Sequence, residues 1–270
     1  MEPILAVVFD FDDTLAPDST SGLMRLVGFE PKAFWSGEFE AMLAEGWDQV
    51  PGFMHKLIAL SEQQGGLITA DFLADWGRRL PLFEGVTEVF GLLREYMAQA
   101  APGFRLEFYL ISSGIGQILR HTAIAPEFTE IWASDFSYNA AQAIAFPKRV
   151  VSFTDKTRYL FQISKGIIGA KAKDSTLVNQ RFESFRIPMH QILFVGDGYT
   201  DIPCFSLLAR KGGEAIAVYQ KERPETWKKA RGFVKDERVK MFERADYRPD
   251  SPLLDSLKGL LVEMAERAGG

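Results

Sequence analysis

Two aspartates, Asp10 and Asp12, follow directly after the apolar run Ile4–Phe9, in the sequence Asp10-Phe-Asp12-Asp13-Thr14. An apolar run this short, with several β-branched residues, predicts a strand that is buried on both faces. Binding sites of open α/β sheets lie at the carboxyl ends of strands, so a ligand would reach the two carboxylates there. The same residues could instead form an acidic turn in which Asp12 or Asp13 bonds to local backbone.

A second predicted strand, Leu106–Ile111, ends in Ser112-Ser113-Gly114, which we expect to form a turn leading into a helix. A hydroxyl and backbone N–H groups at such a turn can hold a phosphate. They can equally serve only as the N-cap of the helix.

The third strong strand, Ile192–Val195, ends in Gly196-Asp197-Gly-Tyr-Thr-Asp201. Glycine on both sides of Asp197 permits a backbone shape that an ordinary surface turn seldom requires. Asp201 stands where a helix is predicted to begin, and an acid is favoured there by the helix dipole alone.

Lys156 lies between the second and third of these strands, just before a helical pattern. A lysine in such a place is most often exposed to solvent. A cluster of carboxylates that binds a phosphoryl group needs a cation, however, and Lys156 can supply it. Lys148 lies nearby in the sequence and could fill the same role.

The elements that must position these residues alternate between strands and helices. Two further short apolar runs, Ile131–Ala133 and Ala215–Val218, predict strands. Alternation of this kind predicts an α/β fold, a Rossmann-like doubly wound parallel sheet. The helical patterns that separate the strands are 86–97, 117–122, 158–165 and 203–210, and 253–268 predicts a closing helix.

Residues 20–80 break this rhythm, because they hold helical patterns, many aromatic residues and no convincing strand. They predict a small helical bundle with its own core, or a helical lid over the site in which some aromatics face a ligand. We therefore divide the chain into an α/β core, residues 1–16 and 80–270, and an inserted helical domain, residues 17–79.

Composition excludes several classes of function. The chain has 270 residues with 31 Lys and Arg against 36 Asp and Glu, a balance that gives no pull toward nucleic acid or an anionic membrane. A single cysteine, Cys204, excludes an internal disulfide and a cysteine-based zinc site. Residues 220–248 mix charges of both signs, which predicts a solvated face. No apolar run could span a bilayer and no leader pattern precedes Asp10, so we expect a cytoplasmic protein.

The order Asp10-x-Asp12-x-Thr14, then Ser112, then Lys156, then Gly196-Asp197-x-x-x-Asp201 resembles the haloacid dehalogenase (HAD) superfamily. The resemblance covers roughly residues 1–16 and 80–220, and the helical insert is similar to the cap domain of that superfamily. In overall layout the chain is most similar to the phosphoserine phosphatase-like group.

This resemblance implies a role for each residue. Asp10 would attack phosphorus and form an acyl-phosphate, and Asp12 would protonate the leaving alkoxide and then activate water. The other residues implied are Ser112, Ser113, Gly114 and Lys156 for phosphate binding, Asp10, Asp197 and the backbone carbonyl of Asp12 as ligands of Mg²⁺, and Thr14 and Asp201 in support.

The expected activity is Mg²⁺-dependent hydrolysis of a small-molecule phosphate monoester. The alternatives are a sugar phosphomutase of the same superfamily and a non-catalytic protein that binds a phosphorylated metabolite. One departure bears on the substrate, because phosphoserine phosphatases carry a Glu nine residues after the nucleophile to hold the substrate amine. Here that position is Ser19, beside Asp18, and Asp18 could substitute for the missing acid.

Overall fold

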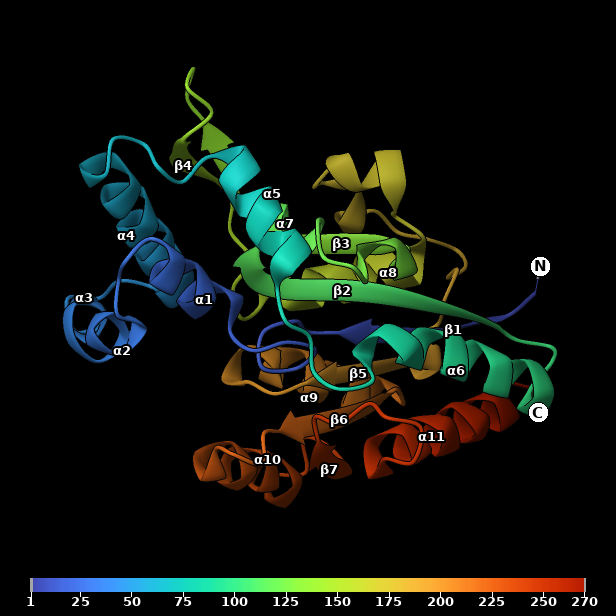
Figure 1. The fold of residues 1–270 in the computed structure, drawn as a ribbon. Coiled ribbons are helices and arrows are strands. Elements are labelled where there is room, and N and C mark those ends of the chain that lie inside the picture. The colour runs from blue at the N-terminus through green and yellow to red at the C-terminus, as the bar shows by residue number, and fades with distance from the viewer. Residues whose placement is uncertain (1, 270) are drawn as a thin grey trace.

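A seven-stranded sheet forms the centre of the protein, in the strand order β4-β3-β2-β1-β5-β6-β7 (Figure 1). The computed structural model describes residues 2–269. All neighbouring strands are parallel except β3 and β4, which run antiparallel. Strand β1 lies between β2 and β5. The chain adds β2, β3 and β4 on one side of β1 and β5, β6 and β7 on the other, so the strand order reverses at β1. Open α/β sheets bind ligands at such a point.

The strands are β1 (Ile4–Phe9), β2 (Arg105–Ile115), β3 (Glu130–Tyr138), β4 (Ile144–Arg149), β5 (Ile192–Gly196), β6 (Glu214–Tyr219) and β7 (Met241–Arg244). The α-helices are α1 (Ser19–Leu26), α2 (Pro31–Ala33), α3 (Phe39–Ala44), α4 (Gln49–Gln63), α5 (Ala70–Arg79), α6 (Val86–Ala100), α7 (Gly116–Leu119), α8 (Asp155–Lys165), α9 (Ile202–Lys211), α10 (Pro224–Lys235) and α11 (Pro252–Gly269). One π-helical segment, η1 (Phe34–Glu38), and the 3₁₀ segments η2 (Ala125–Glu127), η3 (Gly169–Lys173), η4 (Leu177–Asn179), η5 (Met189–Gln191) and η6 (Tyr199–Asp201) complete the set. In the described part of the chain, no helix combines the length and the apolar character that crossing a membrane requires.

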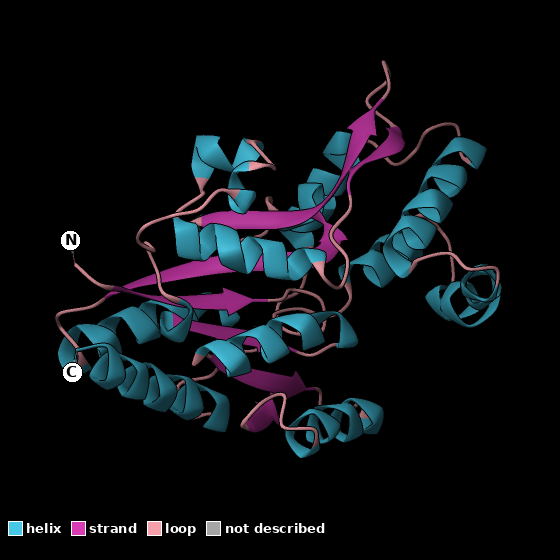
Figure 2. Cartoon of the chain, turned by 180° about the vertical axis from the view of Figure 1, so that it is seen from behind, coloured by secondary structure: helices cyan, strands magenta, loops and turns pink. Residues whose placement is uncertain are grey.

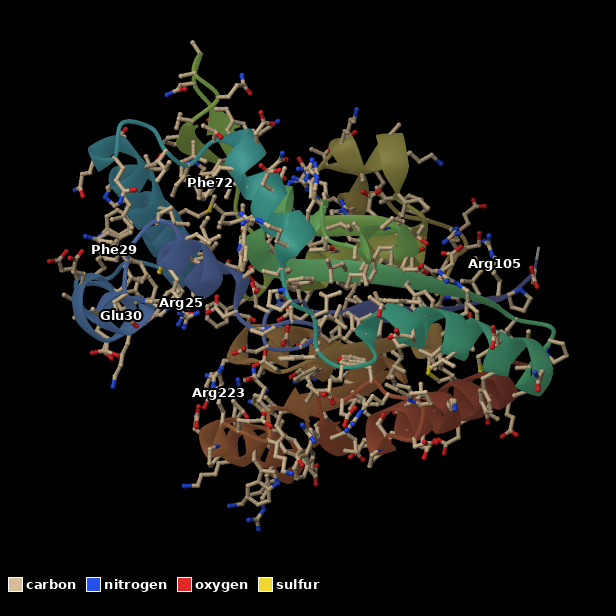
Figure 3. All side chains as sticks on the ribbon, viewed as in Figure 1. Arg25, Phe29, Glu30, Phe72, Arg105 and Arg223 are labelled. Atoms are coloured by element: carbon tan, nitrogen blue, oxygen red, sulfur yellow. The ribbon has the colours of Figure 1, made fainter. Side chains whose placement is uncertain are left out.

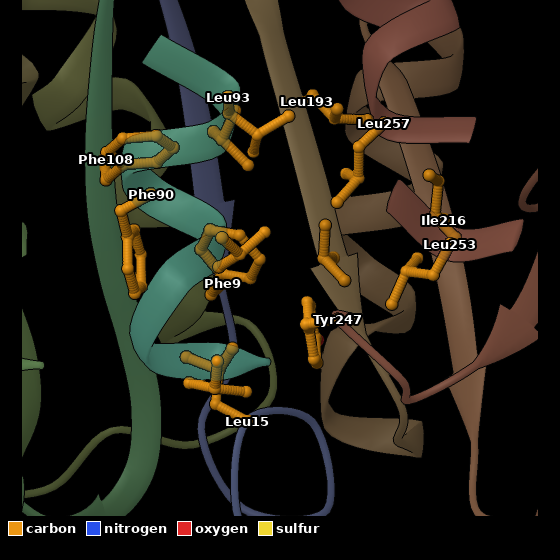
Figure 4. Packing of buried hydrophobic residues seen from close by; sticks show 14 of the residues in the cluster. Phe9, Leu15, Phe90, Leu93, Phe108, Leu193, Ile216, Tyr247, Leu253 and Leu257 are labelled. Carbon is orange, nitrogen blue, oxygen red and sulfur yellow. The ribbon is translucent and has the colours of Figure 1, made fainter. Parts of the chain in front are cut away.

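Both faces of the sheet are covered, because side chains of a strand alternate between its faces. Leu5, Val7 and Phe9 pack with residues of α6 and α11, and the close view shows Phe9 beside Phe90 (Figure 4). Ala6 and Val8 belong to a second cluster with residues of α8, α9 and α10, and helices cover both faces of the sheet (Figure 2). Burial on both faces explains why β1 is an uninterrupted apolar run, as the sequence predicted.

Helices α1 to α4 form a group to one side of the sheet, beyond the carboxyl end of β1, and α5 lies between this group and the sheet, beside α7 (Figure 1). Their apolar side chains form a cluster of their own, which also takes in Ile115, Ile118, Phe136 and Ile144 from the sheet side. Most of the aromatics of this segment, including Phe34, therefore belong to a packed core, as predicted for a helical bundle, and the prediction of a lid is compatible with this packing.

The fold class agrees with the prediction, but three local predictions were wrong. Strand β2 continues through Ser112-Ser113-Gly114 to Ile115, with an irregular register against β3, and α7 begins only at Gly116. The serines are therefore not a helix N-cap, and Ile115 takes that position without a side-chain cap. Strands β4 and β7 were missed, because short edge strands that are only partly buried carry little apolar signal.

Candidate active site

Asp10 is the first residue after β1 and lies at the middle of the sheet. Its backbone N–H donates to the carbonyl of Val195 at 2.9 Å, so the chain stays in register with β5 for one residue beyond the strand. The chain then turns at once, because Leu15 N–H donates to the carbonyl of Phe11 at 2.8 Å. This tight loop keeps Asp10 and Asp12 at the carboxyl end of β1, where the sequence predicted a site.

Lys156 lies in the first turn of α8, completely buried. Its Nζ is 3.0 Å from Oδ1 of Asp10 and 2.7 Å from Oδ1 of Asp201. Burial lowers the pKa of Lys156, but the two carboxylates outweigh it and raise the pKa overall, so the ammonium stays charged. Lys148 is exposed on β4, so the geometry favours Lys156 as the cation of the site.

Three buried carboxylates, from Asp10, Asp197 and Asp201, come together beside this lysine. One oxygen of each lies within 4.8 Å of the others. Hard oxygen donors are the ligands that Mg²⁺ takes in proteins, so this donor set fits the ion that the resemblance implies. The N–H of Gly198 donates to Oδ2 of Asp201 at 2.9 Å, which fixes that carboxylate in the cluster.

Asp12 is not one of the three clustered carboxylates and is held by the first residue of α1. The backbone N–H of Ser19 donates to Oδ1 of Asp12 at 2.7 Å. On the other side Gly114 approaches so closely that a Cβ there would lie 2.6 Å from Oδ2 of Asp12. Glycine is therefore required at position 114 for Asp12 to take this position.

Burial changes the protonation of the acids. Burial is the main reason why the pKa of Asp12 is raised to about 7, and the negative charge of Asp18 raises it further. Burial also raises the pKa of Asp10, with Asp201 contributing, although Lys156 opposes it. The pKa of Asp197 rises to about 6, again chiefly through burial, while Lys229 lowers it. A carboxyl with a pKa near neutrality suits transfer of a proton in both directions.

Residues of β2 lie beside these acids. Ser112 is buried, and its hydroxyl accepts the N–H of Gly114 at 3.0 Å. The Ser113 hydroxyl is buried and has no partner among residues 2–269, so it is free to bind a ligand. The hydroxyl of Tyr247 donates to the backbone carbonyl of Thr14 at 3.0 Å, whereas the Thr14 hydroxyl has no partner among residues 2–269, so the role of its side chain stays a prediction.

Three polar residues near the site were missed. Gln220 and Arg223 donate to the two oxygens of Asp13, at 2.6 and 2.7 Å, and Lys229 donates to Asp197 at 2.7 Å. The segment that begins at Gln220 was predicted as a solvated face. Most charged residues of this segment are exposed, as predicted, and Arg223 lies at the start of α10, on the side toward helix α1, from where it also reaches Asp13 (Figure 3). A possible signal was Asp13 itself, because a third acid beside Asp10 and Asp12 needs positive partners.

A cavity of about 210 Å³ opens from Asp12 toward the helices α1 to α4. Asp18 and Thr20 at the start of α1, and Ser113 and Gly114 on β2, are among the residues that line it. Three aromatic residues also line it. They are Trp35, Phe39 and Phe53.

The arrangement can be compared with known proteins. Structures of phosphoserine phosphatase cover nearly the whole chain, one described as a phospho-aspartyl intermediate analogue and another as a substrate-bound complex. Their TM-scores are 0.56 and 0.55 at 18% and 16% sequence identity, with 95% and 96% of this chain and 99% of each structure covered. The chain shares the fold of these phosphoserine phosphatases. A HAD family hydrolase of Salmonella enterica serovar Typhi matches with a TM-score of 0.55 and 15% identity, over 89% of this chain and 67% of the other.

The sequence comparisons give less information about this protein. No protein-family model matches it. A protein of Borreliella burgdorferi, described as uncharacterized, is 26% identical over 243 residues, which cover 77% of this chain and 79% of the relative.

Proposed function

We propose that the protein is a Mg²⁺-dependent phosphatase, which hydrolyses a small-molecule phosphate monoester through an aspartyl-phosphate on Asp10. The observation that carries this proposal is the pairing of two acids with different surroundings. Asp10 contacts a buried lysine and two further carboxylates, whereas Asp12 faces a cavity with a pKa near 7. A nucleophile and a proton donor require these two environments.

In the first step Asp10 attacks the phosphorus atom, and the bond from phosphorus to the leaving oxygen breaks. Asp12 gives its proton to that oxygen as the bond breaks. Lys156 neutralises charge on the phosphoryl oxygens, and the hydroxyls of Ser112 and Ser113 donate to them, while the N–H of Gly114 holds the Ser112 hydroxyl in place. In the second step Asp12 takes a proton from water, whose oxygen bonds to phosphorus as the bond from phosphorus to the Asp10 oxygen breaks, so that inorganic phosphate leaves and Asp10 is restored.

Asp10, Asp197 and the Asp12 carbonyl would hold Mg²⁺, with Asp201 beside them. When bound, the ion supplies positive charge that stabilises the phosphoryl group during transfer. Because Lys156 and Lys229 contact the same acids, the chain already balances part of their charge without it. We further propose that residues 17–79 act as a cap domain on the core of residues 1–16 and 80–270, since helix α1 supplies both a contact to Asp12 and part of the cavity wall.

The test is phosphate release from a broad panel of small phosphate monoesters, with and without Mg²⁺, for the wild-type protein and Asp10→Asn. We expect metal-dependent turnover that the substitution abolishes. Mass spectrometry of acid-quenched protein should show one added phosphoryl group in the wild type and none in the variant. Slow hydrolysis stimulated by a sugar bisphosphate would instead indicate a phosphomutase. Binding of monoesters without turnover would refute the proposal and favour a binding protein.

A further inference from the structure

The cavity beside Asp12 contains negative charge and no positive charge. Two carboxylates line it, those of Asp12 and Asp18, and none of the described residues that line it is Lys, Arg or His. Lys156 and Lys229 contact Asp10, Asp197 and Asp201 and are not among the lining residues. If Asp10 is the nucleophile, as proposed above, the phosphoryl group binds beside Lys156 and the leaving group lies in the cavity.

Asp18 is a fixed feature of this cavity. It is the N-cap of α1, where its Oδ1 accepts the N–H of Ser21 at 2.9 Å and its Oδ2 accepts the Ser21 hydroxyl at 3.1 Å. The carboxylate therefore keeps its position whether or not a ligand is bound. Its burial also raises its pKa, so its ionised form would be stabilised by a cation.

The aromatic residues that line the cavity also favour a cationic ligand. Trp35 donates its indole N–H to the Ser21 hydroxyl at 2.9 Å, and its ring meets that of Phe39 edge to face, so the aromatic wall is held in place. Aromatic rings and a carboxylate together provide a site for an ammonium group. A carboxylate on the leaving group would meet the like charge of Asp18 and no basic partner among the described residues that line the cavity.

We infer that the leaving group of the substrate is an alcohol that carries an ammonium group and no carboxylate. This inference rests on the proposed phosphatase activity and concerns only what Asp18 and the aromatic wall select. It separates this protein from an enzyme for phosphoserine, whose leaving group carries a carboxylate as well as an amine.

Three probes that differ by one group test the inference: O-phosphoethanolamine, O-phosphoserine and 2-hydroxyethyl phosphate. We expect kcat/KM to be highest for phosphoethanolamine, by at least about tenfold over each of the others, because an unpaired charge or a lost ion pair in a closed site costs at least that much. Equal rates for phosphoethanolamine and 2-hydroxyethyl phosphate, or a higher rate for phosphoserine, would overturn the inference.

Asp18→Asn gives a second, independent readout. Asparagine can still accept the N–H of Ser21, so the cap of α1 is retained while the charge is lost. The ratio of kcat/KM between phosphoethanolamine and 2-hydroxyethyl phosphate should fall about tenfold, mainly through KM. Asp48→Asn is the matched control, because Asp48 is the exposed N-cap of α4 and does not line the cavity. An unchanged ratio in Asp18→Asn, or an equal fall in Asp48→Asn, would contradict the role of Asp18.

Failure of the inference can be told from failure of the proposed function. If no monoester of any kind is hydrolysed, the phosphatase proposal fails first. If neutral or carboxylate-bearing monoesters are turned over and ammonium-bearing ones are not preferred, the phosphatase proposal stands and this inference falls.

Discussion

Replacing Asp12 with asparagine should stabilise the metal-free protein at alkaline pH, although it removes the proposed proton donor. Asp12 is held in a half-buried site where its pKa is about 7, against 3.8 for an ordinary aspartate. The folded protein therefore binds this proton more tightly than the unfolded chain does. Its contribution to stability is fully present below about pH 4 and is lost as the pH rises through about 7.

The size of the effect follows from the two pKa values. The interval from 3.8 to about 7 corresponds to about 4 kcal/mol of unfolding free energy. The asparagine side chain cannot ionise, and its oxygen can still accept the N–H of Ser19, which lies 2.7 Å from Asp12 in the wild type. The variant should therefore keep at pH 8.5 the stability that the wild type loses.

The measurement is urea unfolding followed by tryptophan fluorescence, in excess chelator, at several values from pH 4 to pH 8.5. The free energy of unfolding of Asp12→Asn minus that of the wild type should increase by about 3–4 kcal/mol across this range. Any cost of the substitution that does not depend on pH cancels in the comparison. Asp48→Asn, which removes an exposed carboxylate, serves as the control and should show only a small trend. A flat difference for Asp12→Asn would refute the reasoning, because it would mean that Asp12 ionises as readily in the folded protein as in the unfolded chain.

Three other substitutions test parts of the site by chemical unfolding. Lys156→Met should cost about 3–5 kcal/mol at pH 7.5, since it leaves Asp10 and Asp201 buried without their cation, and a loss below about 1 kcal/mol would contradict the buried ion pairs. Lys229→Met removes the cation beside Asp197, so it should lower the stability of the metal-free protein and increase the stabilisation gained from added Mg²⁺. Lys228→Met, at the exposed neighbouring position, should change neither quantity. Gly22→Ala should cost about 1–3 kcal/mol, because the new Cβ would lie 2.3 Å from the Trp76 ring. Gly91→Ala, in open space on α6, should be neutral or stabilising, and equal costs for the two alanines would count against that contact.

The position of the acids could be predicted from sequence because parallel strands place their carboxyl ends at one edge. Asp10 follows β1 and Asp197 follows β5, and these strands are direct neighbours in the sheet. An uninterrupted apolar run followed by an acid therefore indicated both the strand and the edge of the sheet at which the acid lies. Lys156 could be predicted only as one of two lysines, and its burial in the first turn of α8 separates it from Lys148.

The contacts from α10 could not be predicted in the same way. Arg223 and Asp13 are 210 residues apart in the sequence, and Lys229 and Asp197 are 32 apart. Nothing local distinguishes Arg223 or Lys229 from the other basic residues of the same segment, and mixed charge is typical of an exposed helix. Only the packing of α10 beside β6 brings these two side chains to the acids at the strand ends.

Helix α1 links the proposed chemistry to the proposed selection of substrate. The N–H of Ser19 holds the carboxylate of Asp12, while Asp18 next to it faces the cavity for the leaving group. The carbonyl of Ser19 accepts the indole N–H of Trp76 at 3.0 Å, which ties this turn to α5. A shift of α1 would therefore move the proton donor and the cavity wall together. Under the proposed mechanism, a leaving group that does not fit against Asp18 would also meet a misplaced Asp12, so poor fit should lower kcat as well as raise KM.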